Sequence, residues 1–409
     1  MATFDKKAPG VYVEEISKLP PSVASVATAI PGFVGYTERG TKNTAIRVES
    51  LIDFEEKFGY ACKIAISEED KINGLEYKLH ESMRLFYANG GGICYVVSVG
   101  NYTDAISNTA LETGISMLEP IDEVTMIVVP DAVSLEIKDL ASVQNAALAQ
   151  CLELKDRVAI LDVKDTGNCN TDATNFRNSI GTKGASYGAA YYPYIKSVYD
   201  REINVYDIYK GLKLSNQELE NAQYYAELSE PTEESTLFAK QLMSKPEYAK
   251  LVAKIQEQAN LLPPSGAIAG IYCANDNQRG VWHAPANMSV SGISDINVRI
   301  SDKQQGELNE DTSGKCINAI RAFQGKGILV WGARTLDGLS SEWKYISVRR
   351  FFNYVEESIQ ESTAWAVFQP NDANTWVKVR CQIENFLSNL WRDGALAGST
   401  PQEAFYVRV

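Results

Sequence analysis

The stretch VTMIVVPDAVSLEIKDLASVQNAALAQCLELKDRVAILDV, residues 124–163, decides the fold of this chain. It begins with an apolar run over Val124–Val129 that has the composition of a fully buried strand. A helical pattern follows over Leu135–Leu154, and a second buried strand over Arg157–Val163. A strand, a long helix and another strand are typical of a parallel sheet with a right-handed crossover.

The neighbouring segments continue this alternation of helices and strands. The apolar residues of Gly74–Asn89 fall on one helical face, and a run of three glycines from Gly90 ends that helix. Ile93–Val99 then has the composition of a buried strand. Another helix is predicted over Asp172–Ile180 and another strand over Tyr187–Ile195. The predicted fold class is therefore α/β, with a doubly wound sheet.

Two later regions have different sequence patterns. Residues 200–260 are polar and free of strand patterns, and they predict a helical surface insertion or, alternatively, a partly mobile surface loop. Residues 286–409 predict a separate α+β domain with a buried strand over Gly327–Gly332 and a strand over Ala404–Val409. Helices are expected over Tyr345–Glu361 and Asp372–Asp393, the second capped by Asn371 or Asp372.

The helix Asp372–Asp393 is strongly amphipathic. With a rotation of 100° per residue, its apolar and polar residues fall in two separate sectors of the helix. The apolar sector holds Trp376, Val379, Ile383, Phe386, Leu387 and Leu390. The polar sector holds Asn374, Lys378, Asn385, Ser388 and Arg392.

The N-terminal segment contains an isolated run of strand formers. This run has Pro9-Gly10 before it and Pro20-Pro21 after it, so it has no local hairpin partner. It consists of Val11, Tyr12, Val13, Glu14, Glu15 and Ile16. Its backbone groups can pair with the body of the same chain or with the sheet edge of a neighbouring subunit, or they can stay solvated.

Composition limits the partners of the chain. Its 39 Lys and Arg face 52 Asp and Glu, which gives a net charge of -13 and disfavours nucleic acid and anionic lipid. No run approaches the roughly 20 apolar residues of a membrane span, and the N-terminus lacks a signal-peptide core. The cysteines, at positions 62, 94, 151, 169, 273, 316 and 381, form no CxxC pair. Reduced thiols and no zinc site are therefore expected.

Enzymatic motifs are incomplete, and we predict no catalytic, cofactor-binding or metal-binding residues. The chain has only two histidines, His80 and His283, and no GxSxG nucleophile elbow. TSGKC at Thr312–Cys316 lacks the first glycine of a phosphate loop and has Cys316 where the magnesium-binding hydroxyl belongs.

Several long sequence blocks are similar to those of a known family. They include PGVYVEE (Pro9–Glu15), GFVGYTE (Gly32–Glu38), NGGGICYVV (Asn89–Val97), GASYGAAYYPYI (Gly184–Ile195) and RAFQGKGILVWGARTL (Arg321–Leu336). With them the chain resembles contractile tail sheath proteins of phages and phage-tail-like injection systems. The resemblance implies a structural protein that stacks as hexameric rings around an inner tube and contracts to drive the tube through a membrane. The alternative is a soluble subtilisin-like α/β hydrolase.

The resemblance also implies an architecture and partners. Residues 1–25 are expected to form an extended N-terminal β arm, 26–285 a subtilisin-like but non-catalytic α/β domain, and 286–409 the C-terminal sheath domain. The implied partners are other copies of the chain, an inner tube protein, and baseplate and terminal cap proteins. Assembly is expected in the bacterial cytoplasm, as part of a phage tail or of a released extracellular particle.

Two residue sets follow from the resemblance. Val11–Ile16 is expected to be the intersubunit arm. The polar sector from Asn374 to Arg392 is expected to face the tube or a neighbouring subunit, with an ordinary solvated face as the alternative. Family members usually continue past a strand like AFYVRV, so we expect a longer natural chain or an incomplete C-terminal arm here.

Overall fold

The computed structural model describes the chain from residue 23 onward, except residues 67–71, 202, 204, 207–211, 213, 227, 229 and 231. The described chain divides into two compact units. The larger one, called the body below, is Val26–Val355. The smaller one, called the C-terminal unit, comprises Glu356–Val409 together with residues 23–25.

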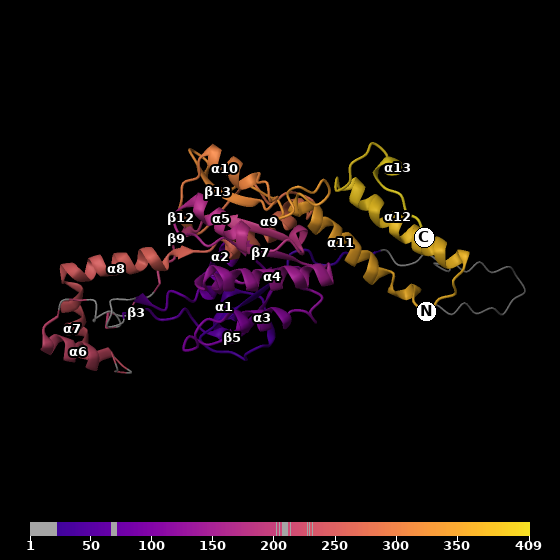
Figure 1. Cartoon of the computed structure of the whole chain (residues 1–409). Coiled ribbons are helices and arrows are strands. Elements are labelled where there is room, and N and C mark those ends of the chain that lie inside the picture. The colour runs from indigo at the N-terminus through magenta and orange to yellow at the C-terminus, as the bar shows by residue number, and fades with distance from the viewer. Residues whose placement is uncertain are drawn as a thin grey trace, which may run out of the picture. The chain divides into compact units, whose positions relative to one another are not determined.

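A large mixed sheet forms the centre of the body (Figure 1). Its order is β11-β14-β13-β8-β7-β6-β1-β5-β2. The central strands from β13 to β5 run parallel, and β2, β14 and β11 add antiparallel edges. The strands are β1 (Pro31–Tyr36), β2 (Ala45–Val48), β5 (Cys94–Gly100), β6 (Met126–Val128), β7 (Val158–Asp162), β8 (Gly188–Tyr192), β11 (Met288–Ser289), β13 (Ile317–Phe323) and β14 (Gly327–Val330).

Helices cover both faces of this sheet, so the predicted α/β class is confirmed. One face carries α3 (Asn108–Ser116), α4 (Ile137–Leu154), α5 (Cys169–Ser179) and α10 (Asp302–Asn309). The other carries α1 (Leu51–Phe58), α2 (Leu79–Ala88), α9 (Ser265–Arg279) and the start of α11 (Ile346–Ser362). Neighbouring strand residues alternate between the two cores: Phe33 packs on the α2 and α9 side, whereas Val34 and Tyr36 pack on the α3 and α4 side.

Two buried carboxylates fix the starts of α2 and α9. Asp131 follows β6 and accepts hydrogen bonds from the backbone N–H groups of Tyr36 (2.6 Å), Lys78 (2.5 Å) and Leu79 (2.9 Å). Asp162 ends β7 and accepts the backbone N–H of Ser265 at 2.9 Å. The side chains of Asp131 and Asp162 therefore act in place of N-cap side chains, which α2 and α9 lack.

The helices α2 and α9 pack very closely. A side chain at Gly270 would meet the carbonyl oxygen of Phe86 at 2.4 Å, so only glycine fits there. The predicted end of α2 is confirmed, because Gly90 has a φ of +96° and the N–H of Gly91 bonds the carbonyl of Phe86 at 3.0 Å. The helix begins at Leu79, later than the predicted Gly74.

The polar insertion is helical, as one of the two sequence interpretations expected. Its described residues include α6 (Asn216–Ala226), α7 (Glu233–Met243) and α8 (Pro246–Ala259). A reciprocal cap between Thr232 and Ser235 begins α7, and a proline begins α8. Small apolar clusters hold these helices together, one of them around Phe238 and Leu242.

Short strands complete the described body. A small sheet has the order β10-β9-β12, made of β9 (Ile195–Ser197), β10 (Leu261–Leu262) and β12 (Ile293–Ile296). A hairpin pairs β3 (Ala65–Ile66) with β4 (Ile72–Asn73). The predicted strand Tyr187–Ile195 is thus divided between β8 and β9, because Pro193 has no N–H to continue the ladder.

Two expectations for the C-terminal third differ from the structure. The predicted strand Ala404–Val409 is wrong: α13 (Pro401–Ala404) ends there, and residues 405–409 form no strand within the described chain. A strand needs a hydrogen-bonding neighbour. The large sheet also continues past residue 286, where a domain boundary is expected, because β11, β13 and β14 belong to it. The three domains as functional divisions stay a prediction.

Candidate functional site

The C-terminal unit is built around α12 (Ala373–Arg392). Asp372 caps this helix by accepting the N–H of Thr375 at 3.0 Å, which confirms one of the two predicted caps. A buried polar contact lies at its centre, where Gln382 accepts the indole N–H of Trp365 at 2.8 Å and donates to the carbonyl of Ser362 at 2.9 Å. The sequence pattern does not predict Gln382 as a core residue, because glutamine is usually exposed.

The two predicted sectors of α12 differ in exposure as expected. In the apolar sector Phe386 and Leu390 are buried, and Val379, Ile383 and Leu387 are half-buried, although Trp376 stays 43% exposed. In the polar sector Asn374, Lys378, Asn385 and Arg392 are exposed, and Ser388 is half-buried. These five residues therefore share one helix side that is exposed except at Ser388.

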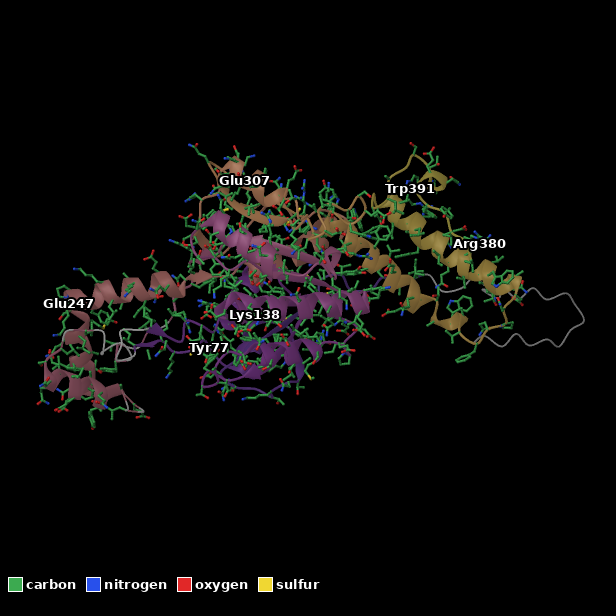
Figure 2. All side chains as sticks on the ribbon, viewed as in Figure 1. Tyr77, Lys138, Glu247, Glu307, Arg380 and Trp391 are labelled. Atoms are coloured by element: carbon green, nitrogen blue, oxygen red, sulfur yellow. The ribbon has the colours of Figure 1, made fainter. Side chains whose placement is uncertain are left out.

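This helix carries an excess of positive charge in an otherwise acidic chain. Lys378, Arg380 and Arg392 are exposed, against a single half-buried acidic residue, Glu384. Figure 2 shows Arg380 and Trp391 on α12. The helix thus presents a local cationic surface, although the whole chain has a net charge of -13.

Large apolar side chains of the C-terminal unit lie uncovered, and sequence patterns did not single them out. Phe368 is 101% exposed and has a φ of +66°, an unusual conformation for a bulky residue. The others are Val367 (59%), Val377 (54%), Tyr406 (89%) and Val409 (48%). Exposed apolar groups of this size mark contact surfaces. For Val367 and Phe368, the sequence signal is the aromatic segment WAVFQPND, which has neither helical nor strand periodicity.

The predicted arm Val11–Ile16 lies outside the described residues. The described chain begins nearby, and the N–H of Ala24 bonds the hydroxyl of Ser362 at 3.0 Å within the C-terminal unit. The structure therefore does not test the arm.

The candidate groups for catalysis are occupied by structural contacts. His80 is buried on α2, and its Nε2 lies 3.2 Å from Oε1 of Glu55. Burial raises the pKa of the nearby Cys62 thiol to about 11, which keeps it protonated near neutral pH. Lys315 of the TSGKC segment donates to the carbonyls of Arg177 (2.6 Å) and Ile180 (2.5 Å) at the end of α5. No serine lines the cavity that contains His80, so the hydrolase alternative finds no support in the described residues.

Metal and membrane features were sought in the same part of the chain. The described residues contain no cluster of three or more His, Cys, Asp or Glu that could hold a metal ion. Every described helix is too short or too polar to cross a bilayer. All seven cysteines are free. With its uncovered apolar side chains, this α/β chain has the features of a subunit of a larger assembly.

Comparison with known families agrees with that class. The model described as the phage tail sheath protein central domain matches residues 104–336, and the model of the phage tail sheath C-terminal domain matches residues 340–408. The chain belongs to the phage tail sheath protein family.

Characterised relatives match over part of their length. The tail sheath protein of Vibrio phage KVP40 is 26% identical over 138 residues, which cover 34% of this chain and 20% of that protein. The tail sheath protein of Enterobacteria phage T4 is 25% identical over 126 residues, which cover 31% of this chain and 19% of that protein. The match thus spans about a fifth of each phage protein.

Solved structures match over nearly the whole chain. The sheath complex of PVC, an extracellular contractile injection system, in its contracted state gives a TM-score of 0.65 at 29% identity, covering 99% of this chain and 88% of that one. The helical sheath of the anti-feeding prophage in its contracted state gives a TM-score of 0.64 at 28% identity, covering 98% and 88%. A chain of the baseplate of the same prophage gives a TM-score of 0.62.

Proposed function

We propose that this chain is the sheath subunit of a contractile tail-like injection machine. Its copies stack as hexameric rings around an inner tube, start from a baseplate, end at a terminal cap and contract to drive the tube through a target membrane. The observation that carries the proposal is the likeness to a contracted sheath over 99% of the chain. Copies that contact each other through different surfaces extend into a helical assembly instead of closing into a small oligomer.

The proposed intersubunit arm is Val11–Ile16. Its prolines at both ends prevent a local hairpin, so its N–H and C=O groups need a partner strand elsewhere. About five backbone hydrogen bonds, at about 0.5–1.5 kcal/mol each, would join each arm to the sheet of a neighbour. Residues 405–409, which lack a strand partner in the single chain, are a second candidate for such pairing.

The proposed tube-facing or neighbour-facing surface is the exposed side of α12. Its residues are Asn374, Lys378, Asn385, Ser388 and Arg392. Exposed ion pairs contribute only about 0–1 kcal/mol each, which suits a contact that must release and slide during contraction. The positive charge of the helix favours an acidic partner surface.

Contraction in this proposal uses no bound nucleotide and no enzymatic step. The energy comes from apolar surface that neighbouring subunits bury as the lattice contracts, at about 25 cal/mol per Å². Lys315 supports a contraction without bound nucleotide, because its amine already donates to two carbonyls at the end of α5. The subtilisin-like character of the α/β domain and its non-catalytic nature are part of the same proposal.

The particle is proposed to assemble in the bacterial cytoplasm and to act as a phage tail or as a released extracellular particle. Coexpression with the inner tube and baseplate proteins of the same locus tests the proposal. Negative-stain microscopy should then show long rods wider than the bare tube. Bare tubes together with soluble single subunits would contradict it.

A further inference from the structure

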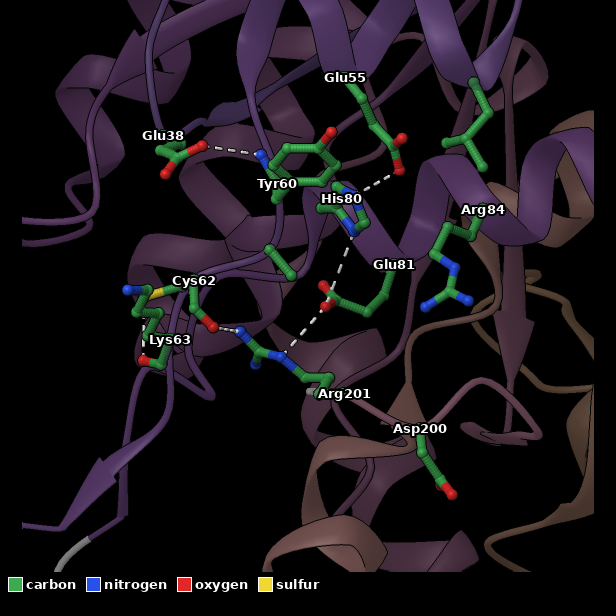
Figure 3. Close-up of a pocket in the computed structure, with 12 residues that line it drawn as sticks. Glu38, Glu55, Tyr60, Cys62, Lys63, His80, Glu81, Arg84, Asp200 and Arg201 are labelled. Atoms are coloured by element: carbon green, nitrogen blue, oxygen red, sulfur yellow. Dashed lines mark hydrogen bonds and ion pairs between the residues drawn. The ribbon is translucent and has the colours of Figure 1, made fainter. Parts of the chain in front are cut away.

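A cavity of about 780 Å³ opens on the body. Figure 3 shows it between α1, α2, the segment around Tyr60 and Cys62, and the root of the insertion at Arg201. Because these elements are far apart in the sequence, the cavity is a product of the fold. None of the contacts proposed for sheath assembly uses it.

Three buried side chains of this cavity carry polar atoms without a hydrogen bond: Glu81, His80 and, at its Nε, Arg201. Glu81 is 3% exposed, and both of its carboxylate oxygens are buried without a hydrogen bond among the described residues. The Nδ1 atom of His80, a residue that is 6% exposed, is likewise unbonded. It lies 4.0 Å from Oε1 of Glu81, too far for a hydrogen bond. An unsatisfied buried polar atom costs about 1–3 kcal/mol, so a bound partner would remove that cost.

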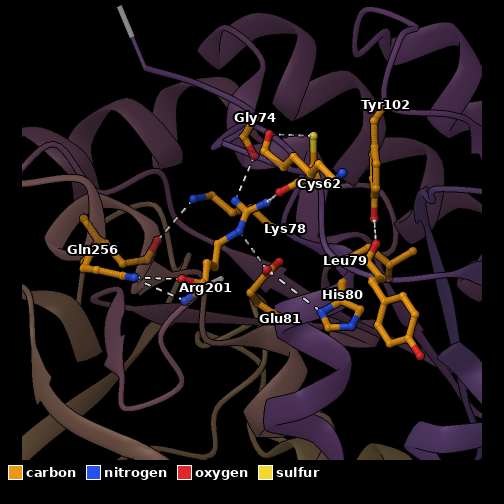
Figure 4. Close-up of polar contacts among 12 residues, drawn as sticks. Cys62, Gly74, Lys78, Leu79, His80, Glu81, Tyr102, Arg201 and Gln256 are labelled. Carbon is orange, nitrogen blue, oxygen red and sulfur yellow. Dashed lines mark hydrogen bonds and ion pairs between the residues drawn. The ribbon is translucent and has the colours of Figure 1, made fainter. Parts of the chain in front are cut away.

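The lining also contains cations: Arg201 already faces Glu81, and Lys63 is exposed. Arg201 lies with its Nε 3.2 Å from Oε1 of Glu81, and its other nitrogens donate to the carbonyls of Gly74 and Cys62 (Figure 4). Arg84 lies over the ring of Tyr199, 4.6 Å from its centre. Oε2 of Glu81 has no hydrogen bond among the described residues, although its carboxylate already faces the Arg201 cation. The buried amine of Lys78 donates to the carbonyl of Leu261 at 3.4 Å.

Apart from Nε of Arg201, a donor that already lies 3.2 Å from Oε1 of Glu81, the unsatisfied buried atoms of this lining are acceptors. In the neutral imidazole, Nε2 faces the Glu55 carboxylate at 3.2 Å and so carries the hydrogen, which leaves Nδ1 of His80 as an acceptor. Oε2 of Glu81 is an acceptor as well. Glu38 and Asp200 add two exposed carboxylates to the lining, and the exposed ring of Tyr60 adds an aromatic face. A ligand that enters this cavity must therefore bring N–H donors and positive charge at its inner end.

We propose that this cavity is a binding site for an organic cation, a guanidinium or a primary ammonium, held by Glu81 and by Nδ1 of His80. The cation can come from a free small molecule or from an arginine or lysine side chain of another copy of the chain. Both sources share the same chemistry at the cavity floor.

Titration of agmatine, which carries a guanidinium and an ammonium, into the purified full-length subunit tests the proposal by calorimetry. Neutral butylurea serves as the uncharged probe. We expect Glu81→Gln to weaken agmatine binding by about tenfold or more, because it removes a charged acceptor. Glu55→Gln, at a partly exposed residue, should weaken it by about threefold and serves as the second variant if Glu81→Gln fails to fold. Glu307→Gln on α10, outside the cavity, is the control and should bind like the wild type.

Repeating the titration on assembled sheath separates the two sources. Agmatine binding that persists in the assembly assigns the site to free small cations, and binding that is lost on assembly assigns it to a side chain of a neighbouring copy. The proposal is overturned if butylurea binds as well as agmatine, if the glutamate variants bind like the wild type, or if agmatine gives no heat up to about 10 mM.

Discussion

The body and the C-terminal unit bury their apolar side chains to very different extents. The body fills both faces of its sheet, and residues such as Phe33, Phe86 and Tyr191 have 0% exposure. Among the described residues from 356 onward, only Phe386 (6% exposed) and Leu390 (5%) are buried apolar side chains, whereas six large ones are exposed: Val367, Phe368, Trp376, Val377, Tyr406 and Val409. A unit with so small a core of its own is expected to gain packing from other chains on assembly.

The body is therefore expected to behave as a folded protein with or without assembly. The C-terminal unit and the N-terminal arm are expected to govern assembly. The following variants separate these two roles, from the largest expected effect to the smallest.

Deleting residues 1–20 should abolish rods and leave a soluble, folded subunit. Among the described residues, the two cores of the sheet begin at Ala29, so this deletion should take nothing from them. Microscopy scores the rods, and thermal unfolding scores the body. Rods of normal length from this variant would show that the arm does not join subunits.

Gly270→Ala should destabilise the body by about 1–3 kcal/mol, because its new methyl group would lie 2.4 Å from the carbonyl oxygen of Phe86. The matched control is Gly306→Ala on α10, where a side chain meets nothing within 4 Å. That change should be neutral or should stabilise the protein by about 0.4–1 kcal/mol. Urea unfolding of both variants measures the difference. Equal midpoints would contradict the close packing of α2 on α9.

Phe368→Asn should weaken assembly while leaving the isolated subunit within about 0.5 kcal/mol of the wild type. The phenyl ring is fully exposed in the single chain, and asparagine tolerates the positive φ at this position. Ile52→Asn on α1 of the body, where the side chain is 69% exposed, is the control. Sedimentation of rods should fall for the first variant alone. An equal fall for both would mean that exposure does not distinguish the two units.

Charge reversal at Lys378 and Arg392 together should reduce recruitment to the inner tube, without lowering the melting temperature of the subunit. Each exposed charge contributes only about 0–1 kcal/mol, so the effect should be strongest at low salt. The double reversal of Lys138 and Lys303, two exposed lysines of the body, makes the same change in net charge. Equal loss of tube binding in both double variants would mean that net charge, and not its position on α12, governs recruitment.

The sequence predicts the fold of the body far better than it predicts the surfaces that we propose as contact and binding sites. The β6-α4-β7 unit and the end of α2 at Gly90 follow from local signals, namely apolar runs, helical period and glycine. The strand at Ala404–Val409 was wrong because strand propensity does not supply a partner. The sheet edge formed by β13 and β14 was assigned to another domain, because sequence distance hides which strands pair.

The functional surfaces divide in the same way. The polar sector of α12 could be predicted, because helical period alone separates it from the apolar sector. The exposure of Phe368 and Tyr406 could not, since both lie outside periodic segments. The cavity at His80 and Glu81 could not be predicted either, because Glu55 and Arg201 reach it from distant parts of the chain.

The most direct test of the account is a cryo-EM reconstruction of the assembled particle, in which the surroundings of the C-terminal unit can be seen. The account predicts rings of six subunits in which Val367, Phe368 and Tyr406 are covered by other chains. It is contradicted if the assembly leaves these three side chains in solvent, or if the purified chain, given its tube and baseplate, remains a single subunit.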